Sequence, residues 1–156
     1  MILIESLFPD TIVTDYKPTN RWDIIKYLVN LLVKNGQLPG ELADSITKAL
    51  IEREKSMSTG IGKGIAIPHC VIDQIEEPKI AMAILPKGIN FEAIDDEPVQ
   101  IIILLLSPKS KMQLHVKNLA AIAKFMNNDQ LKDKLISLKD SSEIKKFIID
   151  NCTNVK

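Results

Sequence analysis

Two runs of apolar residues constrain the fold of this 156-residue chain more than any other feature of its sequence. They extend from Ile80 to Leu85 (IAMAIL) and from Val99 to Leu106 (VQIIILLL), and both are rich in isoleucine. Each run has the length of a strand, and its apolar residues are nearly continuous instead of alternating with polar ones. That pattern is typical of strands that are covered on both faces of a sheet. We therefore expect a central sheet with helices on both sides.

Periodic apolar residues predict helices ahead of these strands. Between Thr19 and Lys34 the apolar residues recur at helical spacing, and Asn35-Gly36 is a typical helix end because glycine accepts a left-handed conformation. A second helix can begin at Pro39, since proline is favoured in the first helical turn. Its apolar stripe reaches Arg53, which should therefore lie near the end of this helix.

Further helices are expected after the strands. Ser110-Lys111-Met112-Gln113 fits a capping box, and the inward face of the helix that follows would begin with His115. The segment from Asp140 to Glu143 is a second helix start of this kind. We predict an α/β fold in which a central mixed β-sheet is flanked by helices on both faces. It forms a single domain over residues 1–156, with a flexible tail after about residue 151.

Composition excludes several classes of function. The chain has 20 basic and 20 acidic residues, so no basic field favours nucleic acid or an anionic membrane as a partner. Its longest apolar run is far shorter than the roughly 20 residues of a membrane helix. The start, MILIESLFPD, has no basic leader, so we expect a cytoplasmic protein without direct membrane insertion. Cys70 and Cys152 form no CxxC pair, which predicts two free thiols and neither a metal nor another cofactor.

Residues 56–70, SMSTGIGKGIAIPHC, are rich in glycine and hydroxyl side chains. Alternate glycines let backbone amides approach a ligand, and hydroxyls add donors, which together suit a phosphate group. The spacing is not that of a Walker A loop, so a nucleotide triphosphate is not expected. A tight connection between strands would use the same glycines for steric reasons alone. The candidate phosphate-binding residues are Ser58, Thr59, Gly60, Gly62 and Gly64.

One of only two histidines follows this loop. His69 comes after Ile65-Ala66-Ile67-Pro68, a short apolar strand closed by a proline, and such an end can present an imidazole rigidly. A lone histidine at a strand end is also often structural or merely exposed. Two histidines without a set of carboxylates make a poor zinc site. The position of His69 alone therefore leaves its chemistry open.

Three segments carry a resemblance to a known family. REKSMSTGIGKGIAIPH, residues 53–69, resembles the active-site signature of the enzyme IIA components of the bacterial phosphotransferase system, in their fructose, mannitol and nitrogen-regulatory superfamily. FEAIDDEPVQIIILLLSP, residues 91–108, and LHVKNLAAIAK, residues 114–124, resemble later segments of the family in the same order. The first of the two looks closest to the nitrogen-regulatory type.

The resemblance implies roles for individual residues. His69 would be the phosphorylated histidine, and Arg53 and His115 match the phosphate-site arginine and the second histidine of the family. Without the resemblance, Arg53 would be a cation at a helix end and His115 a polar residue above a core stripe. Cys70 stands where the family usually has glycine. Its side chain would limit how closely the backbone of a partner can approach at that point.

A phosphoryl carrier is therefore the function that the sequence predicts. The resemblance implies that the phosphocarrier protein HPr supplies the phosphate to His69, with a phosphohistidine as the intermediate. In the nitrogen-regulatory type the phosphorylation state would control regulated target proteins. In the alternative, a sugar-transport type, the phosphate would pass to a cysteine of a IIB domain. A third hypothesis is a binding module that keeps the fold without phosphotransfer.

Overall fold

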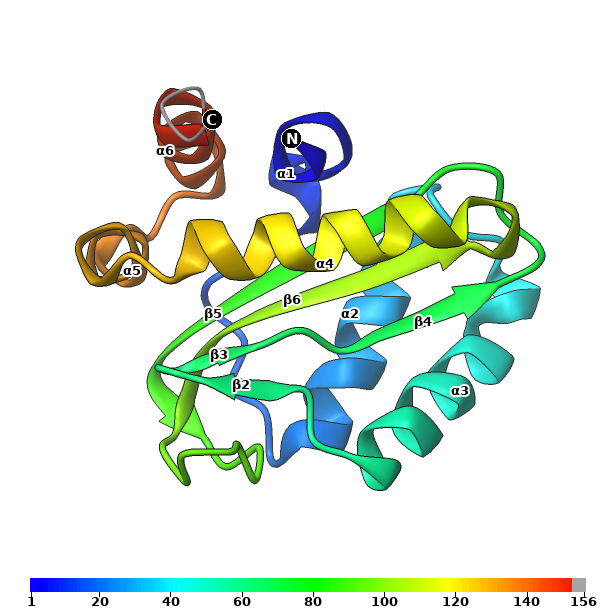
Figure 1. Ribbon diagram of the computed structural model, residues 1–156, viewed down its shortest axis with the longest axis horizontal. Helices are drawn as coiled ribbons and strands as arrows, with labels where there is room; N and C mark the ends of the chain where they lie inside the picture. Colours follow the sequence, from blue (N-terminus) through cyan, green and yellow to red (C-terminus); the bar gives the residue numbers. More distant parts are fainter. Residues whose placement is uncertain (153–156) are drawn as a thin grey trace.

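A mixed β-sheet forms the centre of the computed structural model, which describes residues 1–152 (Figure 1). In this part of the chain the sheet has six strands, and their order is β1-β5-β6-β3-β2, with β4 also paired to β6. Strand β5 is antiparallel to β6, and β2 is antiparallel to β3, whereas β1 runs parallel to β5, and β3 and β4 run parallel to β6. The strands are β1 Ile12–Val13, β2 Gly60–Gly62, β3 Ile65–Ala66, β4 His69–Ile72, β5 Lys79–Ile89 and β6 Val99–Pro108.

Helices cover both faces of the sheet, as predicted. Helices α2 and α3 lie on one face, and α4 crosses the other together with α1, α5 and α6 (Figure 1). Short 3-10 helices occur at Pro9–Thr11, Gly40–Leu42 and Lys109–Lys111. The α-helices are α1 Ile2–Ser6, α2 Arg21–Lys34, α3 Ala43–Ser56, α4 Met112–Met126, α5 Asp129–Ser137 and α6 Ser141–Cys152.

The two continuous apolar runs are explained by two separate cores. Alternate residues of β5, such as Ala81 and Ala83, belong to the core under α2 and α3, whereas Met82 and Ile84 belong to the core under α4. Strand β6 divides its residues between the two cores in the same way. Because successive side chains of a strand point to opposite faces, a strand buried on both faces needs an apolar residue at almost every position.

The ends of the predicted helices differ in how well the sequence located them. Helix α2 ends at Asn35 and Gly36, whose φ is 75°, as expected. Helix α3 begins at Ala43, after the 3-10 turn at Gly40–Leu42, and therefore later than Pro39.

The predicted capping box ahead of α4 is wrong. Residues 109–111 form a 3-10 helix, and Lys111 precedes α4 without a side-chain cap. At α6 the prediction holds, because Asp140 Oδ1 accepts hydrogen bonds from the backbone N–H groups of Ser142 and Glu143. That helix continues to Cys152, which is buried. The rest of the predicted flexible tail, residues 153–156, lies outside the described residues.

Strand β6 positions the segment that contains His69. Strand β3 pairs with residues 101–102 of β6, and β4 pairs with residues 105–108, so His69 lies opposite Leu105. Pro68 separates the two short strands, and its carbonyl accepts a hydrogen bond from Leu105 N–H. The chain thus stays on one side of β6 as it passes the proline.

Replacing Gly60 by alanine should destabilise the fold by about 1–3 kcal/mol, the usual cost of overpacking. A Cβ at this position would lie 2.7 Å from Ala93 Cβ and 2.9 Å from Ala93 Cα, so the backbone must move. The Gly40→Ala variant is the control, because its Cβ would meet only Val33 Cγ1, at 3.6 Å. Urea denaturation measures both free energies of unfolding, and equal losses in the two variants would contradict the steric argument.

Candidate functional site

His69 begins β4, and its ring has a fixed hydrogen bond. The Nδ1 atom lies 2.6 Å from the carbonyl oxygen of Ile67. A carbonyl oxygen can only accept, so Nδ1 carries the proton and donates it. In the neutral ring Nε2 is then the nitrogen with the free lone pair. The next residue, Cys70, packs toward α2 and α3, which directs the alternate side chain of His69 toward the α4 face.

The second histidine lies beside the first. His115 is on the first turn of α4 and only 6% exposed, and its ring centroid is 5.5 Å from that of His69, with the ring planes inclined at 49°. Its Nδ1 is 2.5 Å from Oγ of Ser107, a buried residue of β6. The fold therefore brings together the two histidines that the sequence selected. Sequence reasoning missed Ser107, although it is the first polar residue after the apolar run of β6.

Arg53 lies in the last turn of α3. Its Nη1 donates a hydrogen bond of 2.9 Å to the carbonyl oxygen of Met57, just beyond the helix end. Its charge also acts on His69: burial is the main cause that lowers the pKa of His69, and the Arg53 guanidinium lowers it further. Both the bond to Ile67 and the charge of Glu54 oppose these effects.

The hydroxyls of Ser58 and Thr59 are bound to acceptors within the protein. Thr59 Oγ1 donates to Glu54 Oε2 at 2.5 Å, and Thr59 N–H donates to Oε1 of the same carboxylate at 2.9 Å. Ser58 Oγ donates to the carbonyl oxygen of Phe91 at 2.6 Å. Sequence reasoning missed Glu54. This residue is only 1% exposed, which is unusual for a carboxylate.

Gly62 and Gly64 form the turn between β2 and β3. Their φ values are 97° and 80°, and Lys63 between them has a φ of 57°. The carbonyl oxygen of Gly64 accepts from the N–H groups of residues 100 and 101 of β6, whereas His69 pairs with residue 105. Residues 101 and 105 are four positions apart along β6, which corresponds to about 13 Å. The positive φ values of the turn explain why these two positions are glycines. Gly60 lies nearer to His69, opposite Ala66.

Both histidines are neutral near pH 7. Burial lowers the pKa of His69, and it also lowers that of His115, with the neighbouring His69 as a second cause. Since the ordinary value is about 6.5, the lowered values keep both rings uncharged. Neutral imidazole provides a nucleophilic nitrogen without a separate base.

Stability should therefore decrease as the pH falls from about 7.5 to 5.5. The histidines of the unfolded chain bind protons near pH 6.5, whereas those of the folded chain bind protons only at a lower pH, because their pKa values are lowered. Protonation therefore favours unfolding. This stabilisation is fully present above the pKa of the histidines in the unfolded chain, and it is lost as the pH falls through their lower pKa values in the folded chain. Urea denaturation at both pH values measures the loss, which should shrink in His69→Gln and His115→Gln variants. Because the chain has only these two histidines, equal stability at both pH values would contradict the argument.

The two cysteines are free, and burial affects both. Burial raises the pKa of Cys70 to about 12, so it remains a thiol beside His69. Within residues 1–152 no cluster of three or more histidine, cysteine, aspartate or glutamate side chains could hold a metal ion. The same part of the chain contains no helix with the length and apolar character needed to cross a bilayer.

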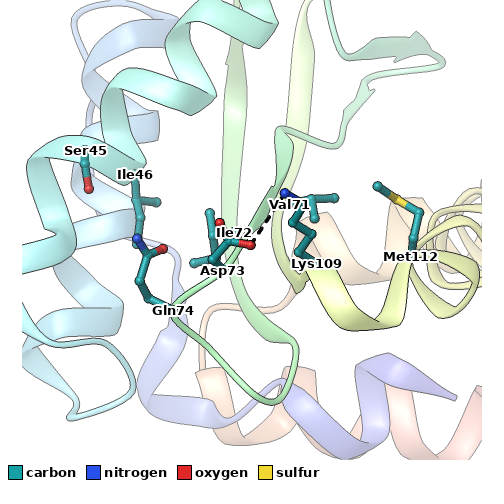
Figure 2. A pocket seen from close by; sticks show the side chains of 8 residues that line it. All are labelled: Ser45, Ile46, Val71, Ile72, Asp73, Gln74, Lys109 and Met112. Atoms are coloured by element: carbon teal, nitrogen blue, oxygen red, sulfur yellow. Dashed lines mark ion pairs between the residues drawn. The ribbon is translucent and has the colours of Figure 1, made fainter.

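A hollow of about 390 Å³ lies at the end of β4 (Figure 2). Val71, two residues after His69, lies on its wall, with Met112 of α4 across from α3. An ion pair of 3.9 Å between Lys109 Nζ and Asp73 Oδ1 spans its edge. The hollow is partly apolar, and it lies toward the end of the strand that His69 begins. The lining residues are Ser45, Ile46, Val71, Ile72, Asp73, Gln74, Lys109 and Met112.

Comparison with known proteins decides the family. Residues 5–151 match the family model described as phosphoenolpyruvate-dependent sugar phosphotransferase system, EIIA 2. The chain belongs to this enzyme IIA family. The resemblance of the three sequence segments is thereby confirmed over most of the chain.

Relatives of this enzyme IIA domain carry both transport and regulatory names. A fructose-specific EIIA component of the phosphotransferase system from Haloferax volcanii is 29% identical over 133 residues, which are 85% of each chain. A nitrogen regulatory protein from Pseudomonas aeruginosa is 32% identical over 127 residues, or 81% of each chain.

Solved structures support the enzyme IIA fold. The nitrogen regulatory protein IIA-Ntr from Neisseria meningitidis has a TM-score of 0.85 at 24% identity, covering 95% of this chain and 99% of that one. In a complex from Escherichia coli, enzyme IIA of the mannitol system is bound to its phosphorylated enzyme IIB; the match has a TM-score of 0.77 at 18% identity, covering 93% and 98% of the two chains. At these identities the likeness establishes the fold alone.

Proposed function

We propose that this chain is a phosphoryl carrier that accepts phosphate from HPr on Nε2 of His69. The observation that carries the proposal is the hydrogen bond from His69 Nδ1 to the Ile67 carbonyl, because it leaves Nε2 with the free lone pair. The neighbouring neutral His115, 5.5 Å away between ring centroids, adds a second polar group at the same place.

The transfer step exchanges one phosphorus–nitrogen bond for another. The Nε2 lone pair attacks the phosphorus of phospho-HPr in line, and the donor imidazole leaves with the electron pair of the broken bond. The positive charge that develops on the His69 ring is stabilised by the Nδ1–H bond to Ile67. The charge on the equatorial phosphoryl oxygens requires fixed donors.

Arg53 and His115 are the donors in this proposal. Arg53 can present its planar guanidinium to two oxygens once it faces the phosphoryl group. If the Ser107 hydroxyl donates to His115 Nδ1, the proton of His115 lies on Nε2 and can be donated to a third oxygen. Ser58 and Thr59 contribute indirectly, because their hydroxyls already donate to protein acceptors, and Gly60 allows the close packing of this segment.

Exposed apolar side chains near the site fit a transient protein partner. Met57 is 70% exposed at the end of α3, and Met112 and Val116, one turn apart on α4, are 50% and 61% exposed. Exposed apolar groups around a polar centre are typical of interaction sites. HPr would dock here and leave quickly, as a carrier requires.

The downstream role is proposed to be regulatory, with control of target proteins by the phosphorylation state. The relatives named nitrogen regulatory protein support this choice, and the fructose-specific relative supports the alternative, transfer to a IIB cysteine. The mannitol complex with phosphorylated IIB is a precedent for that alternative in a protein of the same fold. Incubation of the phosphorylated chain with a IIB domain distinguishes the two roles, because only the transport role gives a phosphocysteine product.

The experiment that tests the proposal is phosphorylation of the purified chain by enzyme I, HPr and phosphoenolpyruvate. Intact-mass analysis should show one phosphoryl group that is labile in acid and stable in base, as expected of a phosphohistidine. Omission of HPr should abolish it. If no adduct forms with the cognate partners, the chain is a binding module and the proposal fails.

A further inference from the structure

A continuous series of hydrogen bonds connects His69 to a buried carboxylate. The Nδ1–H group of His69 donates to Ile67 O at 2.6 Å, and the N–H of Ile67 donates to Thr59 O at 3.1 Å. Thr59 in turn donates its N–H and its hydroxyl to the two oxygens of Glu54, at 2.9 and 2.5 Å. Each link leads from the imidazole toward Glu54.

Glu54 is the fixed end of this series. It belongs to α3, its side chain is fully buried, and it follows Arg53 directly in the sequence. Its oxygens also lie near Ser58 Oγ, at 3.4 Å, and Arg21 Nη1, at 4.0 Å. Hydrogen bonds to an ionised acceptor are stronger than those between neutral groups, so Thr59 is held firmly against the end of the helix.

Arg21 extends the support from a second helix. Its Nη1 donates a 3.1 Å hydrogen bond to the carbonyl oxygen of Phe91, which also accepts from Ser58 Oγ. The segment from Met57 to Thr59 is thereby tied to α2, to α3 and to the loop between β5 and β6. A fully satisfied buried network of this kind makes one local geometry strongly preferred.

Resting on the proposed function, we propose that Glu54 is a positioning residue for phosphoryl transfer: it holds Thr59, and through Thr59 and Ile67 it fixes the orientation and tautomer of His69. The carbonyl of Ile67 can select the Nδ1–H form only while its own peptide is held in place. Glu54 touches neither the phosphoryl group nor the imidazole. It also sets the position of the segment to which Arg53 is bonded.

The substitutions Glu54→Gln and Thr59→Val test this role. Glutamine keeps the size of Glu54 and one acceptor for Thr59 N–H but loses the charge and the second acceptor oxygen. Valine keeps the branched shape of Thr59 and removes the hydroxyl donor. Thr59→Ser restores that donor and is the rescue variant. Glu52→Gln is the matched control, since Glu52 is exposed on the same helix two residues away.

Two readouts separate positioning from a purely structural role. Nitrogen-15 NMR of the His69 ring reports which nitrogen carries the proton, and the wild-type chain should show the Nδ1–H form. In Glu54→Gln and Thr59→Val the ring should populate both tautomers, and transfer from phospho-HPr should slow by about 10-fold to 100-fold, since small displacements of a reacting group have effects of this size. Thr59→Ser and Glu52→Gln should resemble the wild type in both measurements.

The outcomes that would overturn the inference are distinct. If the variants melt at lower temperature but keep the wild-type tautomer and rate, Glu54 supports the fold and not the imidazole. Failure of both variants to fold would lead to the same conclusion. The NMR measurement needs no phosphoryl donor, so a changed tautomer in a chain that accepts no phosphate would retain the positioning role and reject the proposed function.

Discussion

Replacing His69 by alanine should abolish phosphorylation of this chain while leaving it folded. His69 Nε2 is the proposed acceptor atom, and the other histidine is 6% exposed. In the proposed arrangement Nδ1 of His115 accepts from Ser107 and Nε2 carries the proton, so this ring has no free lone pair for the phosphorus and should not substitute for His69. The lost side chain is itself partly exposed at the start of β4, so its removal should have little effect on stability.

The measurement is intact-mass analysis after incubation with enzyme I, HPr and phosphoenolpyruvate, beside a thermal melt. Lys48→Ala, an exposed substitution on α3, provides the control for general effects of truncation. An adduct of the same acid lability on His69→Ala would assign the phosphate to another side chain. A variant that fails to fold would show that His69 is chiefly structural, contrary to this expectation.

The main architecture could be predicted from the sequence because its signals are long and local. The apolar runs of β5 and β6 and the periodic residues of α2 act over many positions and need no distant partner. The sequence did not locate α1, β1, α5 or the short strands β2 and β4. Strand β1 has two residues and pairs parallel with β5 from 70 positions away, so no local pattern marks it. Helix α1 has five residues and depends on packing against α6.

The candidate site could be predicted only as far as its motif extends. Residues 53–69 and the histidine of α4 were selected from the signature, and the fold brings His69 and His115 together. The residues that hold them were missed, because their roles arise from contacts formed in three dimensions. Ser107 meets His115 only because α4 turns back over β6, and Glu54 meets Thr59 only because the chain reverses at the end of α3. The spacing of residues along the sequence therefore predicts neither contact.

Replacing Arg53 by lysine should slow phosphoryl transfer by about 10²–10³, the usual effect of removing a positioned donor from a charged transition state. Lysine keeps the charge but loses the planar pair of donors, so the fold should survive while the transition state is less stabilised. His115→Ala should slow transfer by a similar factor, with an added loss of stability because the Ser107 hydroxyl loses its partner.

A purely structural role for these residues predicts the opposite pattern. Arg53 also donates to Met57 O at the end of α3, so its replacement would then lower the free energy of unfolding by about 1–2 kcal/mol and leave the rate nearly unchanged. Rapid-quench transfer from phospho-HPr and a thermal melt of each variant measure the two quantities independently. A loss of stability at an unchanged rate would show that Arg53 and His115 do not bind the phosphoryl group. The hydrogen bond to the Ile67 carbonyl would then be the contact that orients His69. A loss of rate at retained stability would instead support a contact between the guanidinium and the transferring group, since lysine keeps the charge but lacks the planar pair of donors.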